Sequence, residues 1–368
     1  MSMHEVFMKR ALELARKAEG DTSPNPMAGA VIVRDDQIIG EGYHRACGQP
    51  HADIEAMNDV KDGDCRGATL YITMEPCCYY GRTPPSTDAL IDAGIAEVYY
   101  AVPDPNPMGA GKGHRQLELA GVKVQRGAME DEARELNRDF FHYITTGLPY
   151  VIAKYAMSMD GKIATASGDY QWVTGLESRL AVHGLRDLVD AVLVGADTII
   201  AYDPQLTTRT PNKNGRHAKR VVLDSTGRIP LDAKVFDPKL PGETYVAAVQ
   251  LSVDHQARLE ARGVEVIMMP GDQHGQVSIE ALLQELGRRK VMNLMVEGGS
   301  HVLGSFLESG HIQETWAFIG GMLIGGAEAP SPIDGDGVER ISQALVTEVL
   351  STEVFGNDIL IKSRIKKN

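Results

Sequence analysis

Three residues in the first quarter of the chain have the types and spacing of a metal-dependent hydrolytic site. His51 is followed two residues later by Asp53, and Cys77 comes after a strand-like run, 69–73. An imidazole and a thiolate are common zinc ligands, and a carboxylate near a zinc-bound water can move the protons of a hydrolysis. We expect both ligands to follow strands at the N-termini of helices, where backbone N–H groups favour a thiolate.

A second group lies in the other half of the chain and contains a lysine, a glutamate and two glycines. Lys154 interrupts an apolar run, 151–156, and Glu297 directly precedes Gly298-Gly299-Ser300. A lysine on an edge strand can extend into water, whereas a lysine on an inner strand must be paired. Glycines between a strand and a helix let backbone N–H groups approach a phosphate, although tight turns use glycines in the same way. An anion-binding site and a simple turn both remain open here.

The segments around the first group are predicted to form a layered α/β domain. We expect a helix up to about residue 20, a hairpin from strands 29–33 and 38–43, and then alternating helices and strands to residue 124. One long polar helix, 130–146, should precede Gly147-Leu148-Pro149, which is the predicted domain boundary. The expected domains are therefore 1–147 and 148–368.

The second half repeats the alternation of strands and amphipathic stretches. Its predicted strands are 151–156, 191–194, 221–224, 244–248, 264–268 and 294–296. Two late β-rich runs, 314–319 and 345–362, have no obvious helix between them, so we expect antiparallel edge strands on a mainly parallel sheet. The glycine fingerprint of the common dinucleotide-binding fold is missing from this half, which disfavours that fold.

Composition indicates a folded protein of a reducing compartment. Hydrophobic residues make up 43% of the 368 residues, and 37 Lys and Arg against 50 Asp and Glu give a net charge of −13. This balance argues against binding to nucleic acid or to an anionic membrane. Only four cysteines occur, two of them adjacent, and no export signal or apolar membrane segment is seen. We expect a cytoplasmic protein.

A longer series of motifs resembles the bifunctional deaminase/reductase family of riboflavin biosynthesis. The matching segments of the first half are Ser23-Pro24-Asn25-Pro26, Gly42-Tyr43-His44, His51-Ala52, Glu75-Pro76-Cys77 and Gly81-Arg82-Thr83-Pro84-Pro85. Those of the second half are Ser158-Met159-Asp160-Gly161-Lys162, Gln171-Trp172-Val173-Thr174, Asp203-Pro204-Gln205-Leu206-Thr207 and Val296-Glu297-Gly298-Gly299-Ser300. The resemblance implies an α/β protein with an N-terminal cytidine-deaminase-like three-layer domain and a C-terminal dihydrofolate-reductase-like domain.

The resemblance also implies two reactions and a set of site residues. A pyrimidine ribosyl phosphate would be deaminated by hydrolysis with zinc, and its ribose would then be reduced with NADPH to a ribityl chain. For the deaminase it implies His51 and Cys77 as zinc ligands, Asp53 as the catalytic carboxylate, and Asn25, His44, Arg82 and Thr83 as substrate contacts. For the reductase it implies Lys154, Asp160 and Glu297 as catalytic residues, Thr174, Arg186, Asp203 and Arg209 as substrate contacts, and Trp172, Gly298, Gly299 and Ser300 as cofactor contacts. We also expect a homo-oligomer.

The sequence departs from the family pattern mainly at the zinc site. The family's second zinc cysteine is replaced by Ser86, whose neutral hydroxyl is a poor zinc ligand. The family's glutamate is replaced by the shorter Asp53, which matters because a general acid or base must reach its proton within about 3 Å. Cys78 is a poor substitute ligand, since neighbouring side chains at a helix start point about 100° apart. Tyrosines also stand at 79, 170 and 202, where the family usually has His, Ser and Asp.

These departures leave alternatives at both sites. Three alternatives are open for the N-terminal domain. It has lost catalysis and serves folding or dimerisation, or it deaminates with an unusual zinc site, or its pocket binds a different ligand. For the whole chain, we expect an NADPH-dependent reductase of 5-amino-6-(5-phosphoribosylamino)uracil with an impaired deaminase domain. The alternatives are a paralogue acting on a related pyrimidine, a fully bifunctional enzyme, and a non-catalytic protein that binds the pyrimidine.

Overall fold

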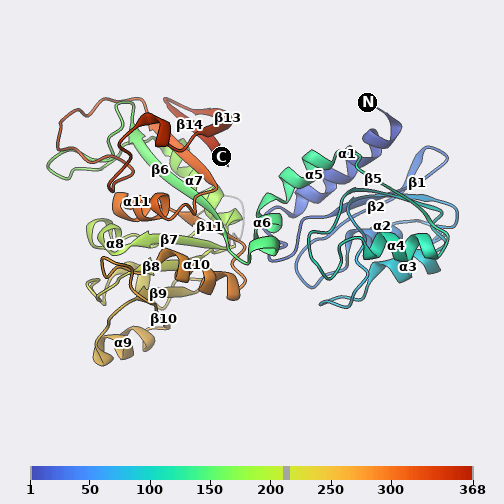
Figure 1. Ribbon diagram of the computed structural model, residues 1–368, viewed down its shortest axis with the longest axis horizontal. Helices are drawn as coiled ribbons and strands as arrows, with labels where there is room; N and C mark the ends of the chain where they lie inside the picture. The colour runs from blue at the N-terminus through green and yellow to red at the C-terminus, as the bar shows by residue number, and fades with distance from the viewer. Residues whose placement is uncertain (1, 210–215, 367–368) are drawn as a thin grey trace. The chain divides into compact units, whose positions relative to one another are not determined.

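The structure is a computed structural model that describes residues 2–209 and 216–366 (Figure 1). The chain divides into two compact units between Gly147 and Leu148. Both units contain a β-sheet with helices on both of its faces. None of the described helices combines the length and the apolar character needed to span a bilayer.

The N-terminal unit is a three-layer α/β structure. Its strands are β1 (Gly29–Arg34), β2 (Gln37–Tyr43), β3 (Thr69–Met74), β4 (Glu97–Val102) and β5 (Lys123–Arg126), and its helices are α1 (Met3–Ala15), α2 (Ala52–Asn58), α3 (Ser86–Asp92), α4 (Lys112–Leu119), α5 (Glu130–Leu136) and α6 (Arg138–Thr146). The sheet has the order β2-β1-β3-β4-β5, and β1 runs antiparallel to both of its neighbours. Ile32 and Leu70 pack against α2, α3 and α4, while Tyr71 faces α1 through Phe7. Alternate residues of the inner strands therefore point to opposite faces of the sheet and pack against the helices on that face.

The predicted single helix over 130–146 is wrong, because the chain breaks at Asn137. The buried Asn137 amide exchanges two hydrogen bonds with the backbone of Met27, at 2.7 Å and 2.9 Å. Its φ of −114° and ψ of 27° lie outside the helical region. Two shorter helices, α5 and α6, result.

The C-terminal unit is built on a nine-stranded sheet. Its strands are β6 (Tyr150–Ser158), β7 (Ala191–Gly195), β8 (Lys219–Leu223), β9 (Thr244–Ala248), β10 (Val264–Met268), β11 (Asn293–Val296), β12 (Glu314–Gly320), β13 (Thr347–Phe355) and β14 (Asp358–Ile365). Its helices are α7 (Leu176–Leu188), α8 (Ala196–Tyr202), α9 (Val253–Glu260), α10 (Ile279–Arg288) and α11 (Ser300–Glu308), and short 3₁₀ turns cover Arg16–Ala18 of the other unit and Lys234–Phe236 and Ile341–Gln343 of this one. The strand order is β10-β9-β8-β7-β11-β6-β12-β14-β13.

Two antiparallel strands close one edge of this otherwise parallel sheet, as expected for the late β-rich segment. β13 and β14 form a hairpin, and β14 pairs antiparallel with β12. The expectation for β12 itself was wrong, because β12 runs parallel to β6. The physical reason is α11, which carries the chain across the sheet from β11 to β12 and so restores the strand direction.

Apolar clusters lie on both faces of the parallel strands. On one face Leu282 and Phe306 from α10 and α11 pack on the sheet, and on the other face Leu185 and Ile199 from α7 and α8 do so. Such two-sided burial explains why these strands are nearly continuous apolar runs. β11 lies between β7 and β6, and the three strands point their carboxyl ends in one direction. In parallel sheets, side chains just beyond such ends meet in one crevice.

Candidate functional site

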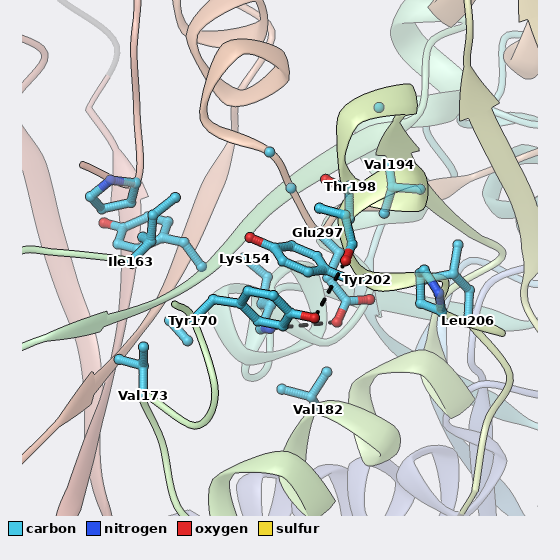
Figure 2. Close-up of a pocket in the computed structure, with 18 of the residues that line it drawn as sticks. Lys154, Ile163, Tyr170, Val173, Val182, Val194, Thr198, Tyr202, Leu206 and Glu297 are labelled. Atoms are coloured by element: carbon cyan, nitrogen blue, oxygen red, sulfur yellow. Dashed lines mark hydrogen bonds and ion pairs between the residues drawn. The ribbon is translucent and has the colours of Figure 1, made fainter. Parts of the chain in front are cut away.

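A cavity of about 850 Å³ lies beside the carboxyl ends of β6, β7 and β11 in the C-terminal unit (Figure 2). Residues of β6, α7, α8 and the start of α11 line it together. Ligand pockets commonly have volumes of about 300 to 1,000 Å³. The cavity is therefore large enough for a substantial organic ligand.

Lys154 and Glu297 meet in this cavity because of the strand register. Ala153 on β6 stands opposite Val296 on β11, so the next residue of each strand lies side by side. Lys154 Nζ is 3.4 Å from Glu297 Oε1, and the two side chains are only 13% and 10% exposed. The expectation that Lys154 on an inner strand is paired is confirmed.

Arg186 is the stronger partner of Glu297. Its Nε and Nη2 donate to the two carboxylate oxygens at 2.9 Å and 2.6 Å, which is a two-point ion pair. Burial acts to raise the pKa of Glu297, but Arg186 and Lys154 outweigh it and lower the pKa to about 2. Burial lowers the pKa of Lys154, and Glu297 opposes that shift. The cluster brings a lysine amine, an arginine guanidinium and a carboxylate together in a water-poor place.

Helix α7 presents one face to the cavity. Arg179, Val182, His183 and Arg186 lie three or four residues apart and all line it. The start of α7 is fixed by Asp358 of β14, which accepts from the Gly175 N–H at 2.7 Å and from the Ser178 hydroxyl at 2.6 Å. Arg179 and Arg186 therefore lie on the same face of α7.

The glycine turn after β11 opens the cavity wall for a ligand. Gly298 has a φ of 138°, which side-chain-bearing residues rarely adopt, and a side chain at Gly299 would lie 3.3 Å from the Thr198 hydroxyl. The turn leads directly into α11, whose first residue, Ser300, also lines the cavity. Backbone N–H groups at such a helix start suit a phosphate.

Aromatic side chains form another part of the wall. Trp172 stacks on the Arg179 guanidinium at 4.2 Å, and Arg179 also donates to the Thr174 carbonyl at 3.1 Å. Tyr170 and Tyr202 lie with ring centroids 3.9 Å apart, and Figure 2 shows the two rings in front of Lys154. Two of the three tyrosines that depart from the family pattern, Tyr170 and Tyr202, therefore form one aromatic pair.

Two predicted residues have structural partners of their own. The Asp160 carboxylate accepts from the N–H groups of Ile324 at 3.0 Å and Gly325 at 2.6 Å, and it is not among the residues that line the cavity. Asp203 lines the cavity but also accepts from the Lys234 N–H at 2.7 Å. All other predicted reductase residues line the cavity, namely Lys154, Trp172, Thr174, Arg186, Arg209, Glu297, Gly298, Gly299 and Ser300.

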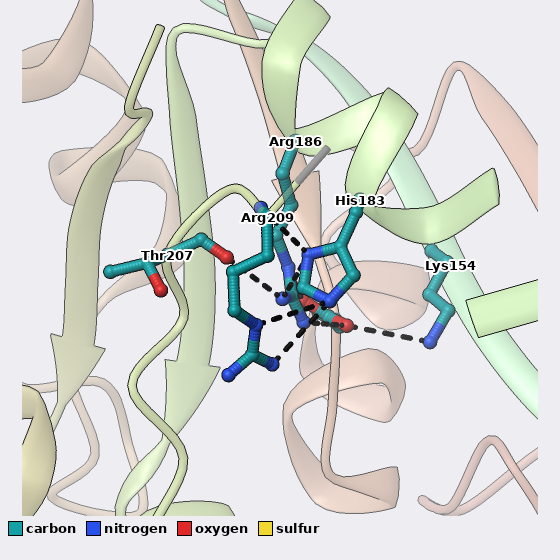
Figure 3. A network of polar contacts seen from close by, with 6 residues as sticks. Lys154, His183, Arg186, Thr207 and Arg209 are labelled. Atoms are coloured by element: carbon teal, nitrogen blue, oxygen red, sulfur yellow. Dashed lines mark hydrogen bonds and ion pairs between the residues drawn. The ribbon is translucent and has the colours of Figure 1, made fainter. Parts of the chain in front are cut away.

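His183 and Thr198 also line the cavity, and neither was predicted from the sequence. His183 contacts both Arg186 and Arg209 (Figure 3), and Thr198 borders the glycine turn. The spacing of His183, three residues before Arg186 in one of the amphipathic stretches, was an available signal. Thr198 lies on a helix of its own, so nothing in the sequence connected it to Gly299.

In the N-terminal unit, the predicted substrate residues cluster around His51. The Thr83 hydroxyl is 2.7 Å from His51 Nε2, and the Asn25 amide is 3.1 Å from His44 Nε2. The other ring nitrogen of His44 is 2.9 Å from the Pro50 carbonyl. Arg82 instead contacts the thiol of Cys47.

The donor set around Cys77 does not fit zinc. The Cys77 thiol donates to the Tyr79 carbonyl at 3.4 Å, and the buried Ser86 occupies the position of the missing cysteine. Cys78 has a different neighbour, the Gly109 carbonyl, at 4.0 Å. Throughout residues 2–209 and 216–366, no cluster of three His, Cys, Asp or Glu side chains is arranged to hold a metal ion. We therefore assign no chemistry to zinc in this chain.

Two further details concern the same site. His51 caps α2 as expected, but Cys77 lies in the loop before α3, nine residues ahead of Ser86, so its predicted place at a helix N-terminus was wrong. Asp53 is 1% exposed, with Oδ1 accepting from the Ile54 N–H and Oδ2 without a hydrogen-bond partner. The shorter carboxylate is thus buried, and only one of its two oxygens accepts a hydrogen bond.

These features define a two-domain protein with a deaminase-like and a reductase-like unit. The family model for the cytidine and deoxycytidylate deaminase zinc-binding region matches residues 1–102, and the model for the RibD C-terminal domain matches residues 149–361. The chain belongs to the RibD family of riboflavin biosynthesis proteins.

Relatives and solved structures agree over nearly the full length. The chain is 42% identical to the RibD protein of Actinobacillus pleuropneumoniae, covering 96% of this chain and 93% of that protein. It is 37% identical to RibD of Escherichia coli, covering 97% and 98%. The structure of Acinetobacter baumannii RibD matches with a TM-score of 0.89 at 36% identity, and that of a Thermotoga maritima deaminase/reductase with 0.85 at 35%, each covering 99% of both chains. The expected fold classes are confirmed.

Proposed function

We propose that the C-terminal unit reduces the ribose of 5-amino-6-(5-phosphoribosylamino)uracil with NADPH, and that the N-terminal unit does not deaminate the precursor of this compound. The observation that carries the first half is the buried cluster of Lys154, Glu297 and Arg186 in a ligand-sized cavity. The observation that carries the second half is the buried Ser86 at the place of a zinc thiolate. The Thermotoga maritima relative is described as a deaminase and reductase of these pyrimidines.

The residues present fit the cofactor. The glycine turn and the first N–H groups of α11 would hold a phosphate, and Trp172 would form a wall of the cofactor side. When bound, NADPH supplies a hydride. The absence of side chains at Gly298 and Gly299 keeps this wall open.

The chain's own contribution to the reduction is to place the ribose and supply a proton. Glu297 fixes the Lys154 amine in the cavity, and Lys154 Nζ would donate a proton to the ribose oxygen that is freed when the ring opens. Arg186 holds the Glu297 carboxylate on two points and keeps it ionised. The buried setting strengthens these interactions because water is largely excluded.

The experiment that tests this function is an NADPH oxidation assay with the purified full-length protein and the deaminated pyrimidine. We expect turnover by the wild type and its loss in Lys154→Met. Ser167→Ala, at an exposed position that does not line the cavity, is the control for effects of substitution and purification alone. Turnover that survives Lys154→Met would contradict the role of Lys154, and no turnover by the wild type with this pyrimidine would contradict the function.

A homo-oligomer and a cytoplasmic location are further parts of the proposal. β13 forms the outer edge of the sheet, and its Val349 and Val354 are 60% and 72% exposed. Unpaired edges with apolar side chains are suited to pairing with another chain. All four cysteines are free, which supports a reducing compartment. Sedimentation of the wild type against Val349→Lys would test the oligomer.

A further inference from the structure

His183 lies between two arginines of the reductase cavity (Figure 3). Its Nδ1 faces the Arg209 backbone N–H at 3.3 Å and Arg186 Nη1 at 3.4 Å. Its Nε2 faces Nε and Nη2 of the Arg209 side chain, both at 3.4 Å. N–H groups therefore face both nitrogens of the imidazole, and the backbone of Thr207 is a further hydrogen-bond partner of the ring.

These surroundings require a neutral ring. Burial lowers the pKa of His183 to about 4, and Arg186 and Arg209 add to this shift, while Glu297 and the Thr207 backbone oppose it. A neutral imidazole accepts at one nitrogen only. The ring can therefore accept a hydrogen bond either at Nδ1 or at Nε2, and the contact at the other nitrogen stays weak.

The two arginines differ in how many N–H donors they have available for a ligand. Arg186 is buried, uses Nε and Nη2 on Glu297, and has the Thr207 carbonyl 3.4 Å from Nη1. Arg209 is exposed, and only the Nε and Nη2 side of its guanidinium faces His183. A planar guanidinium carries five N–H donors, so with respect to residues 2–209 and 216–366 Arg209 keeps donors for an anion on its remaining edge.

We propose that His183 is a positioning residue, which holds the Arg209 guanidinium against the cavity wall so that its free edge meets the substrate phosphate. This inference rests on the proposed function, because it assigns a task within the same cavity. His183 touches no reacting atom in this account. It acts by limiting the directions in which a long and otherwise mobile side chain can point.

The two ring nitrogens allow a matched pair of variants. The amide of Gln reaches about as far as Nε2 and can still hold the Arg209 side chain, whereas the amide of Asn reaches only as far as Nδ1. We expect His183→Asn and His183→Leu to raise KM for the phosphorylated substrate roughly tenfold, the size expected for one charged hydrogen bond, with kcat little changed. His183→Gln should restore KM to within about twofold of the wild type.

Equilibrium binding of ribose 5-phosphate separates this inference from the proposed function. We expect the same order of the variants in its Kd, and no effect of His183→Leu when Arg209 is already replaced by Met. An unchanged Kd in His183→Leu, an equal loss in the Arg209→Met background, or no binding by the wild type would overturn the inference. Ribose 5-phosphate binding with the expected order but without NADPH oxidation would leave His183 in its role and reject the reductase function.

Discussion

Arg186 and Glu297 form a two-point ion pair, with Nε 2.9 Å from Oε2 and Nη2 2.6 Å from Oε1. Arg186, which the family resemblance assigned to the substrate, is thereby paired with a carboxylate of the protein. Lys154 shares the same carboxylate at 3.4 Å. One carboxylate therefore holds both basic side chains of the cluster in place.

Removing Arg186 should destabilise the protein more than removing Lys154. In Arg186→Met, Glu297 keeps only the longer contact with Lys154, and we expect a loss of about 3 kcal/mol in the free energy of unfolding. In Lys154→Met, Glu297 remains paired on two points, so the loss should be clearly smaller while NADPH oxidation disappears. Urea unfolding of the three proteins measures this order. The reverse order would contradict Arg186 as the main partner of Glu297.

Restoring the family residues should restore the zinc site. We expect the wild type to purify without stoichiometric zinc and to release no ammonia from the aminated pyrimidine. Ser86→Cys adds the missing thiolate and should bring zinc, while ammonia release should also require Asp53→Glu, which extends the carboxylate. Metal analysis and an ammonia assay measure the two gains.

Ser86→Ala is the control for this test, since it changes the same buried position without adding a ligand. Stoichiometric zinc in the wild type or in Ser86→Ala would show that we have misjudged the donor set.

The sequence predicted much of the fold, because strong periodicities follow directly from burial. The runs at 191–194 and 244–248 are apolar because both faces of their strands are covered, and both are strands in the structure. The break at Asn137 could not be predicted, since it depends on the backbone of Met27, 110 residues away in the chain. The direction of β12 was missed because the expectation considered only the connection from 314–319 to 345–362, whereas the crossover through α11 before β12 sets its direction.

The residues of the candidate site could be predicted from the sequence only where they belong to a family motif. Lys154 and Glu297 were found, but their contact follows from a strand register that no motif records. His183 was missed because its importance depends on Arg209, which lies in a loop after another helix. Asp160 shows the opposite case, in which a residue of a family motif holds two backbone N–H groups outside the cavity.

His183 should make the protein less stable at mildly acidic pH. Its pKa of about 4 in the folded state lies below the usual value of 6.5, so between these values the unfolded chain binds more protons. The free energy of unfolding should therefore fall as the pH falls through this range. In His183→Gln this part of the slope should be absent, and parallel slopes for the two proteins would contradict a neutral His183.

Asp160 should matter for the stability of its loop. Hydrogen bonds from Ser158, Ile324 and Gly325 lower the pKa of Asp160 to about 2, which shows that the folded state favours the carboxylate. Asp160→Asn weakens these hydrogen bonds. We therefore expect a lower melting temperature and little change in kcat. Ser167→Ala, in the exposed turn nearby, is the control. An unchanged melting temperature with a large loss of kcat would instead support the catalytic role that the motif suggested.

The most direct test of the account follows NADPH oxidation and ammonia release together, in the purified wild-type protein, with the aminated and the deaminated pyrimidine ribosyl phosphates supplied separately. We predict NADPH oxidation with the deaminated compound and neither signal with the aminated one. Ammonia release from the aminated compound at a rate similar to NADPH oxidation would contradict the account.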